Sequence, residues 1–214
     1  MSLLKRVLSK LSRRHSSEFS DELESNIHFM QDPLGDPLHL QRAEQALEFL
    51  LDHAEEAYPR LLELIKSNRA SNPIALIEAF PRFGRPESIP VLEEILARGQ
   101  GTATGAASLS LARHPQDSAR QALIRALTFP KAESVVAAAD GLMSRGDRTA
   151  CAELVKHLNR VDSTVRYHVI QAASRLGCLS SEALTRISND DPDSDIRQMA
   201  SRAMDMRPRE ENDV

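Results

Sequence analysis

Leucines recur every 31 residues through most of this chain of 214 residues. Leu61, Leu92, Leu123 and Leu154 are each 31 positions apart, and Leu184 follows after 30. Mostly apolar side chains recur in the same way three and four positions after each of these leucines. Because positions 0, +3 and +4 lie on one face of an α-helix, every repeat predicts a helix with one apolar stripe.

A second apolar column with the same period predicts another helix in each repeat. Its members are Phe49, Phe80, Leu111, Leu142, Ala173 and Met204. A column of mostly small residues, which includes Gly141, runs beside it and predicts that neighbouring helices approach closely. Gly84, Pro115, Gly146 and Gly177 fall between the two columns, where residues of this kind end helices. Each repeat therefore predicts a first helix, which carries this second column, then a turn, and then a second helix, which carries the leucines.

The repeats determine the expected fold. The alternating β-branched and aromatic runs that indicate strands do not occur. A pair of helices cannot bury both of its apolar stripes alone, so successive pairs must stack on one another. We expect an all-α protein, a right-handed α-solenoid of about five helix-turn-helix repeats at residues 36–206. An N-terminal helical cap at 1–35 precedes it, and a disordered tail at 207–214 follows it.

Two segments carry a family resemblance. Residues 162–166 (DSTVR), with AA at 172–173 and LG at 176–177, resemble the HEAT-repeat consensus in its bacterial, phycobilisome-lyase-like form. Residues 190–197 (DDPDSDIR) look like the start of a further repeat. At the place of the family's Arg, earlier repeats have Pro73, Thr104 and Val135. The resemblance covers roughly residues 36–206. It implies the solenoid shape and leaves the activity open, because this fold serves many functions.

The N-terminal segment has an unusual composition. Residues 1–15 contain five basic residues and no acidic one, with Leu4, Leu8 and Leu11 on one side of a predicted helix. Three interpretations stay open: a helix that caps the solenoid, weak attachment to a membrane surface, or an organelle-targeting segment. The spacing of apolar residues from Phe19 to Met30 predicts one further helix that closes this end.

Charge and cysteine content limit the kinds of ligand and the cellular compartment that we expect. The net charge of -4 divides into +5 for residues 1–15, -9 for 16–100, +4 for 101–188 and -4 for the remainder. A net acidic body is a poor general binder of polyanions. Two cysteines, Cys151 and Cys178, form neither a disulfide framework nor a metal-binding spacing. We therefore expect a packed thiol at Cys151 and a reducing, cytoplasmic location.

A search for catalytic, cofactor-binding or metal-binding motifs yields no candidate. None of the seven histidines is followed by Glu, unlike the His-Glu ligand pairs of deoxyhypusine hydroxylase, and His157 falls in an apolar column. Residues 191–195 have the spacing of a calcium loop, but Ile196 and Arg202 occupy the positions that need Gly and Glu. This segment instead predicts a helix N-terminus near Ile196. The glycines at 99–105 lack the strand and the Lys of a phosphate-binding loop.

The outward side of the second helices offers a candidate binding surface. Positions +2 and +6 are turned about 200° and 240° from the buried leucine at the helical pitch, so they point outward. The predicted groove residues are Glu63, Glu94, Arg98, Arg125, Phe129, Lys156, Arg160 and Arg186. In solenoids of this kind the second helices line the concave side. The change from acid to base along the column would complement a protein partner with segregated charge, and the alternative is an ordinary solvated face.

We therefore expect a non-enzymatic protein-protein interaction module, an adaptor, assembly factor or inhibitor, that holds its partner in this groove without a cofactor or a metal. One alternative is a subunit of a tetrapyrrole-handling enzyme that resembles bilin lyases. Another is a nucleic-acid-binding protein that resembles alkylpurine DNA glycosylases, with Arg125, Lys156, Arg160 and Arg186 against phosphate. The absence of Trp disfavours the last alternative. The identity of the partner and the oligomeric state stay open.

Overall fold

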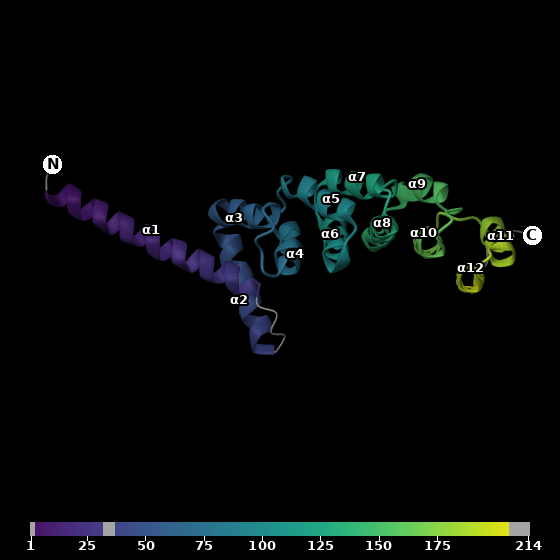
Figure 1. Ribbon diagram of the computed structural model, residues 1–214, viewed down its shortest axis with the longest axis horizontal. Coiled ribbons are helices and arrows are strands. Elements are labelled where there is room, and N and C mark those ends of the chain that lie inside the picture. Colours follow the sequence, from purple (N-terminus) through teal and green to yellow (C-terminus); the bar gives the residue numbers. More distant parts are fainter. Residues whose placement is uncertain (1–2, 32–36, 206–214) are drawn as a thin grey trace, which may run out of the picture. The chain divides into compact units, whose positions relative to one another are not determined.

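The computed structural model describes residues 3–31 and 37–205. These residues form twelve α-helices and one short 3-10 helix, and they contain no strand. The prediction of an all-α fold is therefore confirmed (Figure 1). The chain divides into two compact units, Met1–Phe83 and Gly84–Val214. Among the described helices, none has both the length and the apolar character needed to cross a bilayer.

The first unit contains α1 (Leu3–Met30), α2 (Pro37–Asp52), α3 (Ala54–Lys66) and α4 (Pro73–Phe83). Helix α1 is one continuous helix of 28 residues, so the prediction of two separate helices in this segment is wrong. The reason is local, because residues 12–20 contain no Pro or Gly that would end a helix.

The second half of α1 packs against the rest of the first unit as the spacing of its apolar residues predicts. Leu23, Ile27 and Met30 are buried, and the ring of Phe19 lies 6.4 Å from that of Phe49. The side chains of residues 3–16, the boundary near residue 35 and the tail at 207–214 lie outside the described residues. The predictions for these three segments therefore stay predictions.

The second unit is an array of helix pairs in two layers. Its helices are α5 (Ser88–Arg98), α6 (Gly101–Arg113), α7 (Asp117–Ala126), α8 (Ala132–Arg145), α9 (Cys151–Lys156), α10 (Ser163–Arg175), α11 (Ser181–Asp190) and α12 (Ser194–Asp205), with the short 3-10 helix η1 (Arg148–Ala150) before α9. Helices α6, α8, α10 and α12 begin 31 residues apart and pack in succession as one layer. Helices α5, α7, α9 and α11 lie on the other side of them (Figure 1). The period read from the sequence is thus the period of the structure.

The leucine column forms the core between the layers. Leu92, Leu123, Leu154 and Leu184 are all 0% exposed in the second unit. Leu61 is buried to the same degree within the first unit. Burying a leucine side chain contributes about 1.5–3 kcal/mol relative to leaving it in water, so this column is a main source of stability.

Gly141 shows why the neighbouring column needs small residues. This glycine lies inside α8, and a Cβ atom placed on it would be 2.9 Å from Leu123 Cδ2 and even closer to the hydroxyl of Ser108 on α6. Helix α8 can approach its neighbours this closely only because residue 141 has no side chain. The predicted close approach of successive helices is confirmed at this position.

The contacts of Arg166 recur at the equivalent arginine of the next helix pair. Its Nη1 donates hydrogen bonds to the carbonyl oxygens of residues 160–161, both at 2.9 Å. Arg197 makes the same two hydrogen bonds 31 residues later, at 2.7 and 3.1 Å. In an earlier repeat Thr104 replaces the arginine, and its hydroxyl accepts a hydrogen bond of 2.7 Å from the backbone N–H of Gln100. In these last two repeats the family arginine therefore ties the turn before its helix to that helix.

Cys151 and Cys178 form a disulfide, with their Cα atoms 5.1 Å apart. The prediction of a packed free thiol at Cys151 is therefore wrong. The two residues are 27 positions apart, which is one period of 31 less about one helical turn, so stacking brings them together. The bond joins the first residue of α9 to the turn after α10. It also removes the basis on which a reducing compartment was expected.

Candidate protein-interaction groove

The structure divides the predicted groove between its two units. Glu63 lies on α3 in the first unit, and the other seven residues lie in the second unit. The residues predicted to point outward at position +2 are all exposed, namely Glu63, Glu94, Arg125, Lys156 and Arg186. A continuous column across both units stays a prediction, and the site described below belongs to the second unit.

Arg125 does not present a free positive charge. Its Nε and Nη2 each donate a hydrogen bond of 2.7 Å to one carboxylate oxygen of Glu93 on α5. The hydrogen bond to Glu93 raises the pKa of Arg125 above its ordinary value. Along α5, Arg98 pairs with Glu94 at 2.8 Å. The acid-to-base order of the column is therefore partly neutralised within the chain, although exposed pairs of this kind contribute only about 0–1 kcal/mol and open readily.

Arg160 and Lys156 are also engaged with the chain itself. Lys156 pairs with Glu153 at 2.6 Å on α9. Arg160 is half-buried and donates hydrogen bonds of 3.2 Å to the carbonyl oxygen of Leu127 and to Nδ1 of His157. His157 is half-buried, in keeping with its place in an apolar column, and desolvation together with the nearby charge of Arg160 lowers the pKa of its imidazole. Arg160 thus ties the turn after α9 to the end of α7.

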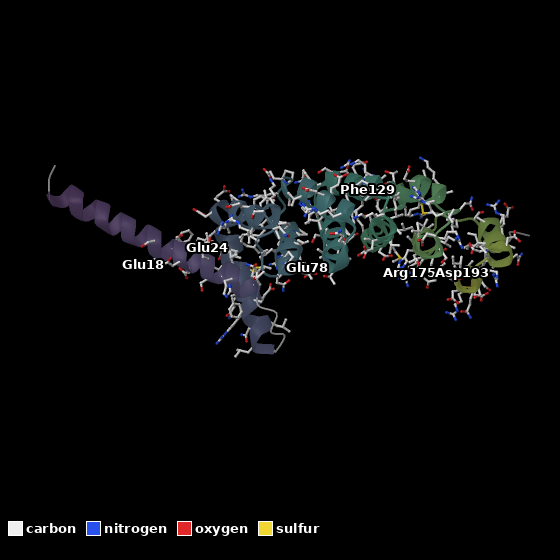
Figure 2. The ribbon with its side chains drawn as sticks, viewed as in Figure 1. Glu18, Glu24, Glu78, Phe129, Arg175 and Asp193 are labelled. Atoms are coloured by element: carbon white, nitrogen blue, oxygen red, sulfur yellow. A yellow bond between two sulfur atoms is a disulfide. The ribbon has the colours of Figure 1, made fainter. Side chains whose placement is uncertain are left out.

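Phe129 is the aromatic member of the predicted groove. It follows the end of α7, where its backbone N–H donates a hydrogen bond of 3.1 Å to the carbonyl oxygen of Ala126. Its side chain is half-buried, and Figure 2 shows it on the side of α7 and α9. Phe129 therefore lies just beyond α7, in the layer of second helices.

A hollow of about 620 Å³ lies between α9 and α11, and we call it the α9–α11 hollow. Its lining includes Val155, Leu158, Val161 and Ile187, together with the predicted residues Arg160 and Arg186. Val155 is 43% exposed and Val161 is 98% exposed. No described residue forms an ion pair with Arg186. The hollow therefore combines apolar surface in contact with water and one available cation.

Sequence reasoning missed the two valines of this hollow. One signal could have found Val161, which occupies a turn position where other repeats have Asn68, Gly99 and Pro130. A fully exposed apolar side chain in place of a turn-forming residue has no local structural reason. Val155 gives no comparable signal, because its column contains apolar residues in other repeats as well.

The acidic segment before α12 has the structural role that was predicted for it. The Asp193 carboxylate accepts hydrogen bonds from the backbone N–H groups of Asp195, at 2.9 Å, and Ile196, at 3.4 Å. Asp191 binds Arg166 instead. In the part of the chain that the structure describes, no group of three His, Cys, Asp or Glu side chains lies close enough together to hold a metal ion.

These stacked helix pairs with a single period define an α-solenoid, a class of protein in which each repeat contacts mainly its neighbours. Residues 106–205 match the family of HEAT repeats, so the solenoid is of the HEAT type over this range. The narrower resemblance to phycobilisome lyases stays a prediction.

Two further comparisons add little about function. Among solved structures, that of human deoxyhypusine hydroxylase in complex with glycerol is similar, with 16% sequence identity and a TM-score of 0.42. The similarity extends over 90% of this chain and 98% of that chain. Likeness at this level supports no functional argument. No curated protein matches the sequence.

Proposed function

We propose that the chain is a protein-protein interaction module that binds a partner protein through the second helices of its second unit. The observation that carries the proposal is the α9–α11 hollow, in which Val155 and Val161 are exposed beside Arg160 and Arg186. The HEAT-repeat match supports an interaction role, because solenoids of this kind present extended surfaces to their partners.

The chemistry of the hollow indicates what kind of partner fits. Burying an exposed Val contributes about 1.5–3 kcal/mol relative to leaving it in water, so Val155 and Val161 favour an apolar side chain of the partner. Arg186 favours a carboxylate beside that side chain, and Arg is among the residues that most often dominate binding energy. We therefore expect the partner to insert an apolar residue flanked by an acidic one.

Charged pairs elsewhere on the layer of second helices would set specificity. In the pairs Arg125–Glu93, Arg98–Glu94 and Lys156–Glu153 the basic side chain is exposed, so each can exchange partners at a modest cost in free energy. In this proposal the module has no catalytic role and acts as an adaptor, an assembly factor or an inhibitor. A cytoplasmic location remains part of the proposal, although the disulfide removes the cysteine argument for it.

The two alternative functions receive less support from the geometry. A nucleic-acid interface needs Arg160 to contact phosphate, but this half-buried side chain is engaged with the carbonyl oxygen of Leu127. Titration with duplex DNA at low salt and absorbance after addition of a tetrapyrrole would test the two alternatives directly. A salt-dependent DNA shift or a spectral change would favour one of them over the interaction module.

The decisive experiment changes the hollow and compares the proteins that are captured. The double variant Val161→Asp, Arg186→Glu is compared with the wild type in quantitative affinity capture from a source lysate. Arg113→Glu on α6 is the matched control, because it reverses an exposed arginine of the other layer. We expect specific partners to be lost with the double variant and retained with the control. Equal recovery with all three proteins would refute the proposal.

A further inference from the structure

A second, larger hollow lies in the other layer of the same unit. It has a volume of about 940 Å³ and lies between α10 and α12, and we call it the α10–α12 hollow. It shares no lining residue with the α9–α11 hollow. It lies between two successive first helices, whereas the proposed partner site lies between two second helices. A ligand bound here would therefore occupy a separate surface.

Opposite charges line the two ends of this hollow. Arg175 is the last residue of α10, and Arg202 lies in the last turn of α12. Asp193 and Asp195 lie at the beginning of α12 (Figure 2 labels Arg175 and Asp193). Helices α10 and α12 occupy equivalent places in successive repeats and run in the same direction, so both arginines lie at one end and both aspartates at the other.

The two arginines are available to a ligand, unlike others in this unit. No described residue forms an ion pair with the guanidinium group of Arg175 or of Arg202, and both side chains are exposed. By contrast, Arg166 is saturated by a carboxylate and two carbonyl oxygens. Two guanidinium groups that line one hollow can hold a carboxylate with charge-assisted hydrogen bonds.

The middle of the hollow has the chemistry of a surface that binds a peptide backbone. Gln171 on α10 and Gln198 on α12 both line it. A glutamine amide both donates and accepts hydrogen bonds, as does each peptide group of an extended chain. Tyr167 and Met199 add an aromatic ring and a flexible apolar side chain on the same surface. His168 is held by Asp140, whose carboxylate oxygen lies 2.9 Å from Nδ1.

The length of the hollow sets the length of the ligand. At 1.5 Å per residue, Arg175 lies about 18 Å along α10 from the first residue of that helix, and Arg202 lies about 14 Å from Asp193 along the axis of α12. An extended peptide rises about 3.3 Å per residue, so side chains about five positions apart would reach the two charged ends.

We propose that the α10–α12 hollow binds an extended peptide segment of a second partner protein, with an acidic side chain against Arg175 and Arg202 and a basic side chain about five positions away against Asp193 and Asp195. This site goes beyond the proposed function and does not depend on it. Together with the proposed partner site in the other layer, it would let the chain hold two partners at once as an adaptor does, and this last step alone rests on the proposed function.

The test is selection from a random peptide library on the full-length protein, followed by fluorescence polarisation with the selected peptides. We expect them to carry an acidic and a basic residue about five positions apart. The variant Arg175→Glu, Arg202→Glu should weaken their binding by about tenfold or more. Arg186→Glu, in the α9–α11 hollow, is the control and should leave their affinity unchanged.

A charge swap separates loss of binding from loss of folding. Peptides whose acidic residue is replaced by Lys should bind Arg175→Glu, Arg202→Glu better than they bind the wild type. Absence of selected peptides, equal affinity for the arginine variant, or failure of the swap would overturn the proposal. Peptides weakened only by Arg186→Glu would also overturn it, and they would support the separate site proposed between α9 and α11.

Discussion

Arg166 on α10 and Asp191, which precedes α12, form a doubly hydrogen-bonded ion pair with N···O distances of 3.1 and 3.0 Å. Their side chains are 9% and 8% exposed. Burial by itself raises the pKa of Asp191, but hydrogen bonds from Arg166 and from the backbone of residue 193 hold this pKa below its ordinary value. Because Arg166 also binds the turn at residues 160–161, one side chain joins two successive turns between repeats.

Removing the carboxylate of this pair should destabilise the fold. Asp191→Ala leaves Arg166 buried with two carbonyl partners and no counter-charge, and we expect the free energy of unfolding to fall by about 3 kcal/mol. Chemical denaturation followed by circular dichroism measures this change. Glu94→Ala, which removes an exposed partner of Arg98, is the control and should cost less than about 1 kcal/mol. Equal losses for the two variants would show that burial does not strengthen the Arg166–Asp191 pair.

Two glycine substitutions should change stability in opposite directions. Gly141→Ala places a methyl group against Leu123 and Ser108, and overpacking of this kind costs about 1–3 kcal/mol. Gly105→Ala on α6 meets no atom within 4 Å and should stabilise the helix by about 0.5–1 kcal/mol. Midpoints of thermal or urea unfolding distinguish the two outcomes. A stabilised Gly141→Ala variant would mean that α8 can move away from its neighbours without loss.

The disulfide should stabilise the part of the chain around α9. Closing a loop of 27 residues is worth about 3.5 kcal/mol in the chain-entropy description. Helix α9 has only six residues, of which Leu154 is buried, so it depends on its surroundings to stay folded.

We expect the double variant Cys151→Ser, Cys178→Ser to lower the free energy of unfolding and to increase amide hydrogen exchange in residues 151–158. Helix α7, which the disulfide does not join, serves as the internal control within the same sample. Unchanged exchange in α9, with and without a dithiol reductant, would contradict the prediction.

Acid should weaken the second unit through His114. This residue is 1% exposed, its Nε2 lies 3.2 Å from the carbonyl oxygen of Arg85, and its Nδ1 accepts a hydrogen bond of 3.2 Å from the N–H of Gln116. Desolvation lowers the pKa of its imidazole, and the charge of Arg145 lowers it further. His157 shifts in the same direction.

The sign of the pH dependence follows from these lowered pKa values. Below the ordinary histidine pKa, near 6.5, the unfolded chain binds protons that the folded chain does not. The contribution is therefore fully present above pH 6.5 and is lost as the pH falls towards the folded pKa, by up to about 1.4 kcal/mol per pH unit for each histidine. Urea unfolding at several pH values measures this slope, and His114→Gln should flatten it. Stability that rises on acidification would disagree with the expected sign.

Local pattern alone determined most of the architecture. The recurrence of Leu92, Leu123 and Leu154 every 31 residues predicted both the period and the buried face, because a helix places such positions on one stripe. The close approach at Gly141 followed from its place in a column of small residues. The exposure of Arg125 and Arg186 followed from their angular distance to the buried leucines.

Tertiary structure alone decided which of these side chains meet. A period of 31 residues identifies neighbouring helices, but a long side chain on one helix can reach several residues of the next. Arg125 pairs with Glu93 and Cys151 bonds to Cys178 because of the rotation and spacing of stacked helices, which the sequence pattern does not specify. The same packing leaves Val161 in water and Arg175 without an ion-pair partner among the described residues, so both hollows became visible only in three dimensions.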